Sequence, residues 1–133
     1  MDIIDKAKKL NLPRGKYAIF GSGPMTIYKI RDSRDVDIIV TKDLYSIIKN
    51  NPEFKEKTWD DGDRYLVKDN IGIFHSWNYG EYRPDVDKLI DQAELVEGIP
   101  FVPLQEVLKW KKAFGREKDK KDIQLIEKYI NSE

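Results

Sequence analysis

Two aspartates separated by one residue, Asp35 and Asp37, are the residues of this sequence best suited to chemistry. They surround Val36 and precede the apolar run 38–40, which together predict a strand buried on both faces. Because side chains alternate along a strand, both carboxylates should point to the same side, followed by Ile39 in the core. Two like charges this close are unfavourable without a cation, and carboxylates with substrate phosphates are typical Mg²⁺ ligands. The pattern therefore indicates a site for Mg²⁺ and phosphate.

A second polar element precedes the aspartates, where the apolar run 17–20 ends in Gly21 and Ser22. Gly21 permits a tight turn and close approach to a ligand, and Ser22 offers a hydroxyl at the start of a short helix. Pro24 favours the first turn of that helix, because a proline lacks the N–H that would be unpaired there. Helix N-termini attract anions, so we expect Gly21 and Ser22 to bind phosphates.

These two elements together resemble the signature of the nucleotidyltransferase superfamily, whose members are similar to the catalytic domain of DNA polymerase beta. The matching segments are Phe20-Gly21-Ser22 and Asp35-Val36-Asp37-Ile38. Residues 110–123, WKKAFGREKDKKDI, also resemble the C-terminal helices of small bacterial and archaeal nucleotidyltransferases, including the lincosamide-modifying type. The resemblance implies that Ser22 holds a triphosphate, that Asp35 and Asp37 bind Mg²⁺, and that no separate substrate domain is present.

The helix predicted over 104–114 places Lys111 in the middle of an apolar arc. One interpretation is that Lys111 lies along apolar surface and emerges at its edge. The other is that it reaches the nucleotide phosphates, with Arg116 beside it to bind a phosphate in bidentate fashion. We expect Asp119 and Asp122 to cap the last helix and to pair with neighbouring basic residues.

A third acid is the point at which this sequence departs from the family. Active members usually carry it on a later strand, where it completes a two-metal site. The strand predicted over 71–77 offers His75 in its inward-facing set instead. His75 is interpreted either as a base near neutral pH or as a half-buried histidine. Slow turnover by the isolated protein is the consequence that we expect.

Two groups of residues also have a purely structural interpretation: the aspartates with the Gly-Ser turn, and the aromatic residues. Asp35 and Asp37 are alternatively solvated residues on an edge strand, with Gly21 and Ser22 in a plain turn. Four aromatic residues form either a wall for a nucleobase or aromatic substrate, or ordinary packing: Trp59, Trp77, Tyr79 and Tyr82. The basic run over 109–121 is mostly interpreted as a solvated helix face.

Length and composition indicate one globular domain over residues 1–133. The 24 Lys and Arg residues balance the 24 Asp and Glu residues, so the chain has no general attraction to nucleic acid or to anionic membranes. The absence of cysteine excludes disulfides and thiolate metal sites. With no membrane-spanning run and no secretory pattern, the sequence predicts a cytoplasmic protein without a membrane partner.

The predicted fold is α/β (α+β), with a mixed sheet of four or five strands and helices packed largely on one side. Beyond the core motif, strands are expected over 54–59, 64–68, 71–77 and 99–102, with a hairpin turn at Asp69-Asn70. Helices are expected over 2–11, 42–51, 85–93, 104–114 and 118–131.

The function expected from the resemblance is Mg²⁺-dependent transfer of a nucleoside monophosphate from an NTP, with ATP as the expected donor, to a hydroxyl. The acceptor is a small molecule, an RNA end or a protein. The alternative is a catalytically weak or inactive binding module, such as the antitoxin-like partner of a small helical protein. A homodimer is a further expected assembly.

Overall fold

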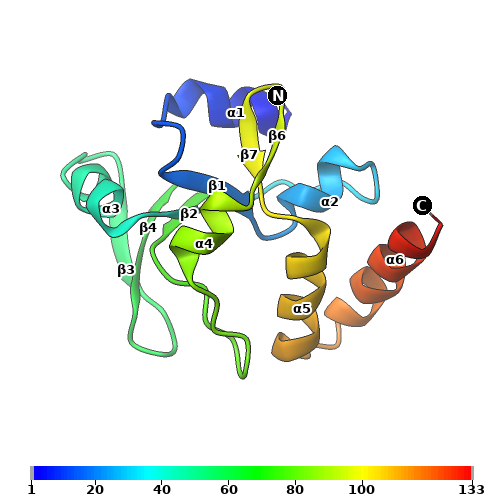
Figure 1. The fold of residues 1–133 in the computed structure, drawn as a ribbon. Coiled ribbons are helices and arrows are strands. Elements are labelled where there is room, and N and C mark those ends of the chain that lie inside the picture. Colours follow the sequence, from blue (N-terminus) through cyan, green and yellow to red (C-terminus); the bar gives the residue numbers. More distant parts are fainter. Residues whose placement is uncertain (1, 133) are drawn as a thin grey trace.

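A single mixed sheet organises the computed structural model, which describes residues 2–132 (Figure 1). In the described chain the sheet has seven strands in the order β3-β4-β5-β2-β1-β7-β6, so the expected four or five strands were too few. The strands are β1 (Tyr17–Phe20), β2 (Val36–Val40), β3 (Lys55–Thr58), β4 (Arg64–Lys68), β5 (Ile71–Phe74), β6 (Glu94–Val96) and β7 (Ile99–Phe101). The α/β class and the mixed character of the sheet are confirmed.

The centre of the sheet is formed by β1 and β2, which pair antiparallel, while β5 runs parallel to β2 and β7 runs parallel to β1. The hairpin turn at Asp69-Asn70 is confirmed, because Lys68 pairs with Ile71 across it. The hairpin of β6 and β7 was not predicted. Its turn consists of Glu97 and Gly98, both with positive φ (52° and 83°), as a two-residue hairpin turn requires.

Helices cover both faces of the sheet, with the larger number on one face, in agreement with the expectation of helices largely on one side (Figure 1). The helices are α1 (Ile3–Leu10), α2 (Gly23–Ile27), α3 (Lys42–Lys49), α4 (Val86–Asp91), α5 (Leu104–Phe114) and α6 (Asp119–Asn131). The first and third helices pack with one face of the sheet, and the other four pack with the opposite face. The polar residues discussed below lie on the face covered by α5 and α6.

Short side-chain caps and the apolar pattern explain where the helices begin and which side they bury. Thr41 caps α3 by accepting a hydrogen bond from the Leu44 amide, and Leu44 and Ile48 are buried beneath it. Ile47, between them on the same helix, points outward and is 66% exposed. The α5 helix ends at Gly115, whose φ of 66° suits glycine and turns the chain into α6.

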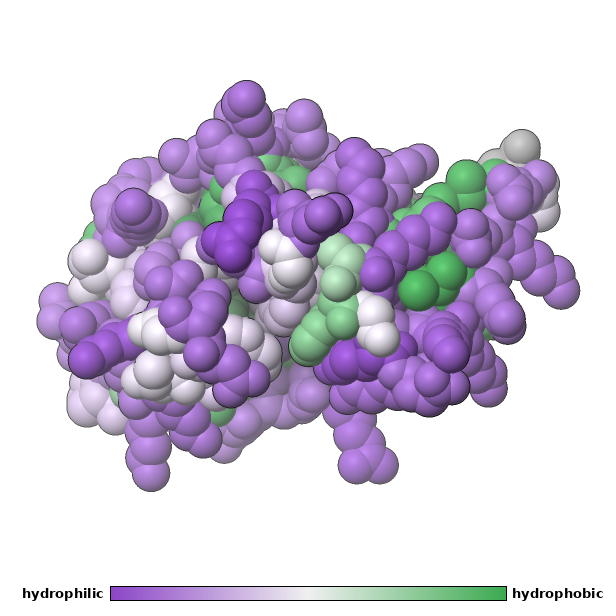
Figure 2. All heavy atoms as spheres, turned by 90° about the horizontal axis from the view of Figure 1, so that it is seen from below, coloured by the Kyte–Doolittle hydropathy of each residue, from purple (hydrophilic) through white to green (hydrophobic). Residues whose placement is uncertain are grey.

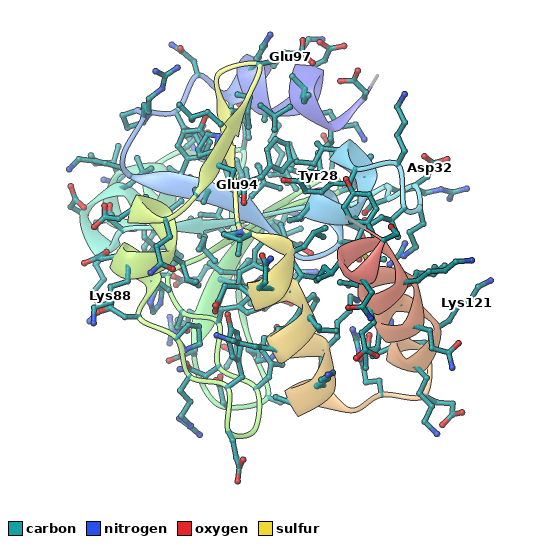
Figure 3. The ribbon with its side chains drawn as sticks, turned by 45° about the vertical axis from the view of Figure 1, so that its right-hand side comes forward. Tyr28, Asp32, Lys88, Glu94, Glu97 and Lys121 are labelled. Carbon is teal, nitrogen blue, oxygen red and sulfur yellow. The ribbon has the colours of Figure 1, made fainter. Side chains whose placement is uncertain are left out.

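A polar contact ties the end of α2 to the edge of the sheet. The Tyr28 hydroxyl donates a hydrogen bond to Glu94 Oε2 at 2.6 Å, which joins residues far apart in the sequence (Figure 3). Hydrophilic residues dominate the surface seen from below, as expected for a chain that is 36% charged (Figure 2). None of the helices within residues 2–132 is long and apolar enough to cross a membrane.

Candidate functional site

Asp37 on β2 is held between two glycines, Gly21 in the turn after β1 and Gly72 on β5. A Cβ atom added to Gly21 would lie 2.5 Å from Asp37 Oδ2, and one added to Gly72 would lie 3.2 Å from Asp37 Oδ1. Gly21 also has a φ of 61°, in the left-handed region that favours glycine. Both glycines therefore leave the space that the carboxylate occupies, and Gly21 has two independent reasons to lack a side chain.

The strand places its acids as the alternating pattern predicts. Val36 and Ile38 are buried in the core cluster on one face, whereas Ile39 is buried in the cluster on the other. Asp35 and Asp37 share the side of Ile39 and both line the same cleft, which confirms that they point the same way. Asp35 lies just before the strand and is exposed.

The acidity of Asp37 reflects this position. Burial of the carboxyl and the nearby charge of Asp35 raise the pKa of Asp37 from 3.8 to about 6, although the Lys111 ammonium acts in the opposite direction. A cation bound between the two carboxylates would relieve both effects. The donor set consists of oxygens, as Mg²⁺ prefers. In residues 2–132, however, no group of three or more His, Cys, Asp or Glu is placed to hold a metal ion, so the described site offers a pair of acids.

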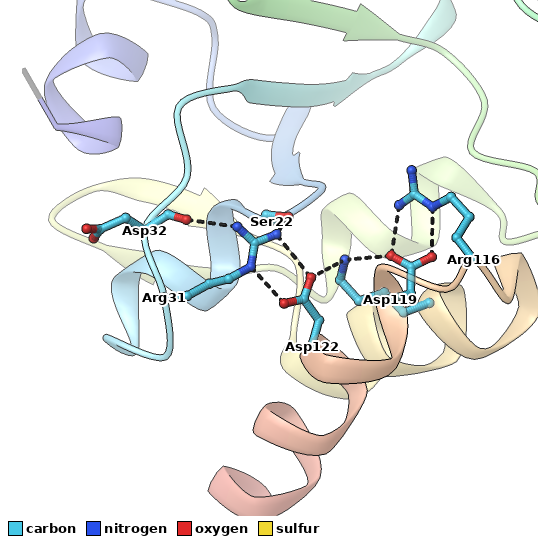
Figure 4. A network of polar contacts seen from close by, with 7 residues as sticks. Ser22, Arg31, Asp32, Arg116, Asp119 and Asp122 are labelled. Atoms are coloured by element: carbon cyan, nitrogen blue, oxygen red, sulfur yellow. Dashed lines mark hydrogen bonds and ion pairs between the residues drawn. The ribbon is translucent and has the colours of Figure 1, made fainter.

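Ser22 immediately precedes α2, but its hydroxyl forms no helix cap. Instead, Ser22 Oγ accepts a hydrogen bond from Arg31 at 2.7 Å (Figure 4). The same guanidinium donates to both carboxylate oxygens of Asp122 on α6, at 2.8 and 3.0 Å. Arg31 was not identified from the sequence, because it lies in an irregular loop where no periodicity marks it. It joins the expected phosphate-binding turn to the C-terminal helix.

Lys111 on α5 is buried, with 1% of its surface exposed, so the interpretation that it emerges at the edge of the core is wrong. Its ammonium lies 3.0 Å from Asp122 and 3.4 Å from Asp119 (Figure 4). Arg116 donates to both oxygens of Asp119, at 2.8 and 2.9 Å. The expected pairing of these two aspartates is therefore confirmed, whereas the expected capping is wrong, because the N-cap residue of α6 is Lys118 and no side chain caps the helix.

Three cations and two carboxylates form what is here called the buried chain of charges: Arg31, Lys111, Arg116, Asp119 and Asp122. Lys111 and the two aspartates are buried, whereas the two arginines at its ends are partly exposed. Burial alone would raise the pKa of each carboxyl, but the hydrogen bonds and charges of their partners outweigh it and hold both pKa values below the ordinary range. The group thus carries one excess positive charge. All five residues line the cleft that also contains Asp35 and Asp37.

The cleft has a volume of about 680 Å³ and brings together most of the site residues predicted from sequence. Ser22, Asp35, Asp37, Lys111 and Arg116 line it, and Gly21 lies behind the Asp37 carboxylate. Residues from the first 40 positions therefore meet residues from the last 25, as the two matching segments suggested.

His75 is not part of this group. In the parallel pairing of β2 and β5, Asp37 lies opposite Gly72, so the alternate residues 71 and 73 face the other side of the sheet. His75 follows on that other side, where its ring meets Tyr45 of α3 edge to face at 4.6 Å. The placement of His75 beside the acids was therefore wrong. The residue that faces Asp37 from β5 is Gly72.

Replacement of Lys111 by methionine tests the buried charges. Lys111→Met should lower the free energy of unfolding by about 3 kcal/mol, because it removes the buried ammonium that contacts both carboxylates and leaves each with a single, partly exposed guanidinium as its partner. The neighbouring Lys112 provides the control, since it forms an exposed pair with Glu127 at 3.3 Å. Lys112→Met should cost less than about 1 kcal/mol. Equal losses in urea denaturation of the two variants would contradict the assignment.

The pH dependence of stability tests the environment of Asp37 in metal-free protein. Because folding raises the pKa of this acid, the folded state holds the proton more tightly, and stability falls as pH rises from about 4 to about 6. Asp37→Asn removes this penalty, so the variant should be more stable than wild type by about 3 kcal/mol at pH 7.5. The difference should vanish near pH 3.5. A difference that is the same at both pH values in chelator-treated samples would exclude the raised pKa.

Comparisons with protein-family models, with characterised proteins and with solved structures return no match to this chain. The resemblance to the nucleotidyltransferase superfamily therefore stays a prediction from the two sequence segments. In the structure, Asp35, Asp37 and the buried chain of charges line one cleft.

Proposed function

We propose that the protein binds a Mg²⁺–nucleoside triphosphate and transfers the nucleoside monophosphate to a hydroxyl group, with ATP as the expected donor. The observation that carries the proposal is the position of the Asp37 carboxylate, packed between Gly21 and Gly72. Phe20 pairs with Asp37 across β1 and β2, so Gly21 and Ser22 follow directly beside the acid. Acids and phosphate-binding turn thus adjoin at the edge of the same cleft.

The charges of the cleft suit this ligand. Asp35 and Asp37 would hold Mg²⁺, which when bound screens the negative charge of the phosphates. Ser22 is placed to contact the β- and γ-phosphates, and the Arg31 guanidinium, which is engaged with Asp122 and Ser22, adds positive charge beside it. Lys111 and Arg116 are engaged with aspartates, so they contribute positive potential more than direct contacts.

Transfer requires little covalent chemistry from the protein. The hydroxyl oxygen of the acceptor forms a bond to the α-phosphorus, and the bond from that phosphorus to the oxygen bridging to the β-phosphate breaks. Pyrophosphate leaves, and the hydroxyl proton passes to solvent or to a base. Positioning and electrostatic stabilisation supply most of the catalysis in such reactions. Small molecules, RNA ends and proteins all carry hydroxyls that meet this requirement.

A second candidate function is nucleotide binding with slow or no transfer, and Gly72 favours it. The strand position that faces Asp37 carries no side chain, so the described site lacks a third acid for a second metal. Asp85 is no substitute, because it caps α4 and lines a separate pocket. Such a module would act with a partner, for which a small helical protein or a second copy of the chain is proposed.

Binding of Mg-ATP measured by titration calorimetry tests the metal and phosphate assignment. Wild type should bind ATP only with Mg²⁺ present. Asp35→Asn and Asp37→Asn should each weaken that binding at least tenfold, because either change removes a carboxylate from the metal. Asp91→Asn changes the same charge at an exposed position on α4 and should have no effect. Unchanged affinity in both cleft variants would rule out the metal site.

Introduction of the missing acid separates the two candidate functions. Gly72→Asp places a carboxylate on the side of Asp37, at the cost of a small shift of the Phe74 ring edge, which lies 2.7 Å from the added Cβ. In the presence of ATP, the number of Mn²⁺ ions bound per protein should rise by one relative to wild type. Wild type that already binds two ions with ATP would contradict the view that its site is incomplete.

A further inference from the structure

The side chains that line the floor of the cleft differ in chemical character from one strand to the next. The phosphate-binding turn follows β1, and the paired acids belong to β2. Beyond Gly72, the side chains of the floor become aromatic. Phe74 on β5 pairs with Ile39, and Tyr65 on β4 pairs with Phe74, so both rings lie on the side of the sheet that carries the acids. Four partly exposed aromatic residues line this end of the cleft: Trp59, Tyr65, Phe74 and Tyr79.

These four side chains, here called the aromatic surface, form a connected arrangement. The rings of Tyr65 and Phe74 are stacked, with centroids 5.1 Å apart and planes inclined by 7°. Trp59 meets Tyr65 edge to face at 5.5 Å and Tyr79 at 6.2 Å. The stacked pair and the perpendicular indole leave apolar ring surface exposed within a cleft that is otherwise charged.

The membership of this surface differs from the aromatic wall expected from sequence. Trp77 is only 2% exposed and stacks on Phe20 with centroids 4.7 Å apart, so it belongs to the core. Tyr82 lies outside the cleft lining and donates a hydrogen bond to Glu106 at 2.9 Å. Tyr65 and Phe74 take their places, because the register of β4 and β5 directs them to the acidic side.

We propose that the aromatic surface stacks the nucleobase of the nucleoside triphosphate, an inference that rests on the proposed function. Such a ligand has negatively charged phosphates at one end and a planar base at the other. The cleft offers groups in the same spatial order: the turn at Ser22 with Arg31 beside it, then the two aspartates, then the aromatic surface. The step from β2 to β4 spans two strand spacings, about 10 Å. Between them lies Gly72, where the Phe74 ring edge and the Asp37 carboxylate come within 2.7 and 3.2 Å of the position that a Cβ atom would take, so the acid and the aromatic rings adjoin directly.

Mg-ATP and Mg-tripolyphosphate both carry three phosphates, but only Mg-ATP carries a base. Comparing their affinities therefore separates base stacking from phosphate binding. Trp59→Ala should lower the affinity for Mg-ATP by roughly 5- to 100-fold, the range typical of base stacking on an aromatic side chain. Its affinity for Mg-tripolyphosphate should equal that of wild type. The control is Phe54→Ala, since Phe54 lies in the same region of the chain but packs against the core cluster on the opposite face. It should leave both affinities unchanged.

Two further substitutions at Trp59 keep the test informative if Trp59→Ala does not fold. Trp59→Leu keeps apolar bulk without a π face and should weaken Mg-ATP selectively, whereas Trp59→Phe should retain most of the affinity. Circular dichroism verifies that each variant is folded. Mg-ATP affinity equal to that of wild type in Trp59→Leu, or an equal loss for both ligands, would overturn the stacking proposal.

The variant Asp37→Asn distinguishes failure of this inference from failure of the proposed function. Loss of both Mg-ATP and Mg-tripolyphosphate in Asp37→Asn, together with a selective effect at Trp59, supports both proposals. Unchanged binding in Asp37→Asn with a selective effect at Trp59 would overturn the metal assignment and retain the stacking surface. Wild type that binds neither ligand would overturn both.

Discussion

Close packing of one carboxylate against two glycines is the constraint on which the arrangement of the site depends. Asp37 occupies space that a side chain at Gly21 or Gly72 would fill, so the turn after β1 and the strand β5 both meet this acid of β2. This contact fixes the turn at Gly21 and Ser22 next to the pair Asp35 and Asp37, and it leaves β5 without a side chain at the position that faces Asp37. The raised pKa of Asp37 is the electrostatic consequence of the same crowding.

The buried chain of charges has a different role. It connects the loop after α2, through Arg31 and Asp122, to Lys111 and Asp119 on the two C-terminal helices. Buried ion pairs contribute little net stability, because desolvation offsets much of their attraction. Their geometry is nevertheless specific, since each carboxylate bonds to two cations. The chain therefore holds α5 and α6 in place beside the acids and leaves one positive charge uncompensated at the cleft.

The sequence was most informative where periodicity or a short motif was strong. The common side of Asp35 and Asp37 followed from alternation along a buried strand, and the bounds of α5 followed from its apolar arc. The partners of Lys111 were harder to predict from the sequence, because the turn at Gly115 determines which residues of α6 contact the Lys111 side chain. Arg31 lies in a loop that carries no periodic signal.

The side of each residue on β5 was the feature least accessible from sequence. Alternation indicates which residues share a side but not which side faces Asp37, and that depends on the pairing of β5 with β2. The strand also ends at Phe74, so the alternation assumed up to Trp77 does not extend that far. This explains why His75 was placed beside the acids and Gly72 was overlooked. The three-residue strand β6 was missed because so short and exposed a segment has little hydrophobic pattern.

A crystal structure with Mn²⁺ and a non-hydrolysable ATP analogue would test the central claim most directly. Mn²⁺ replaces Mg²⁺ at oxygen sites and is located by its anomalous scattering. The account predicts an anomalous peak between the carboxylates of Asp35 and Asp37, with the terminal phosphates against Ser22 and Arg31. A nucleotide bound elsewhere, or one bound in this cleft without metal at the two aspartates, would contradict it.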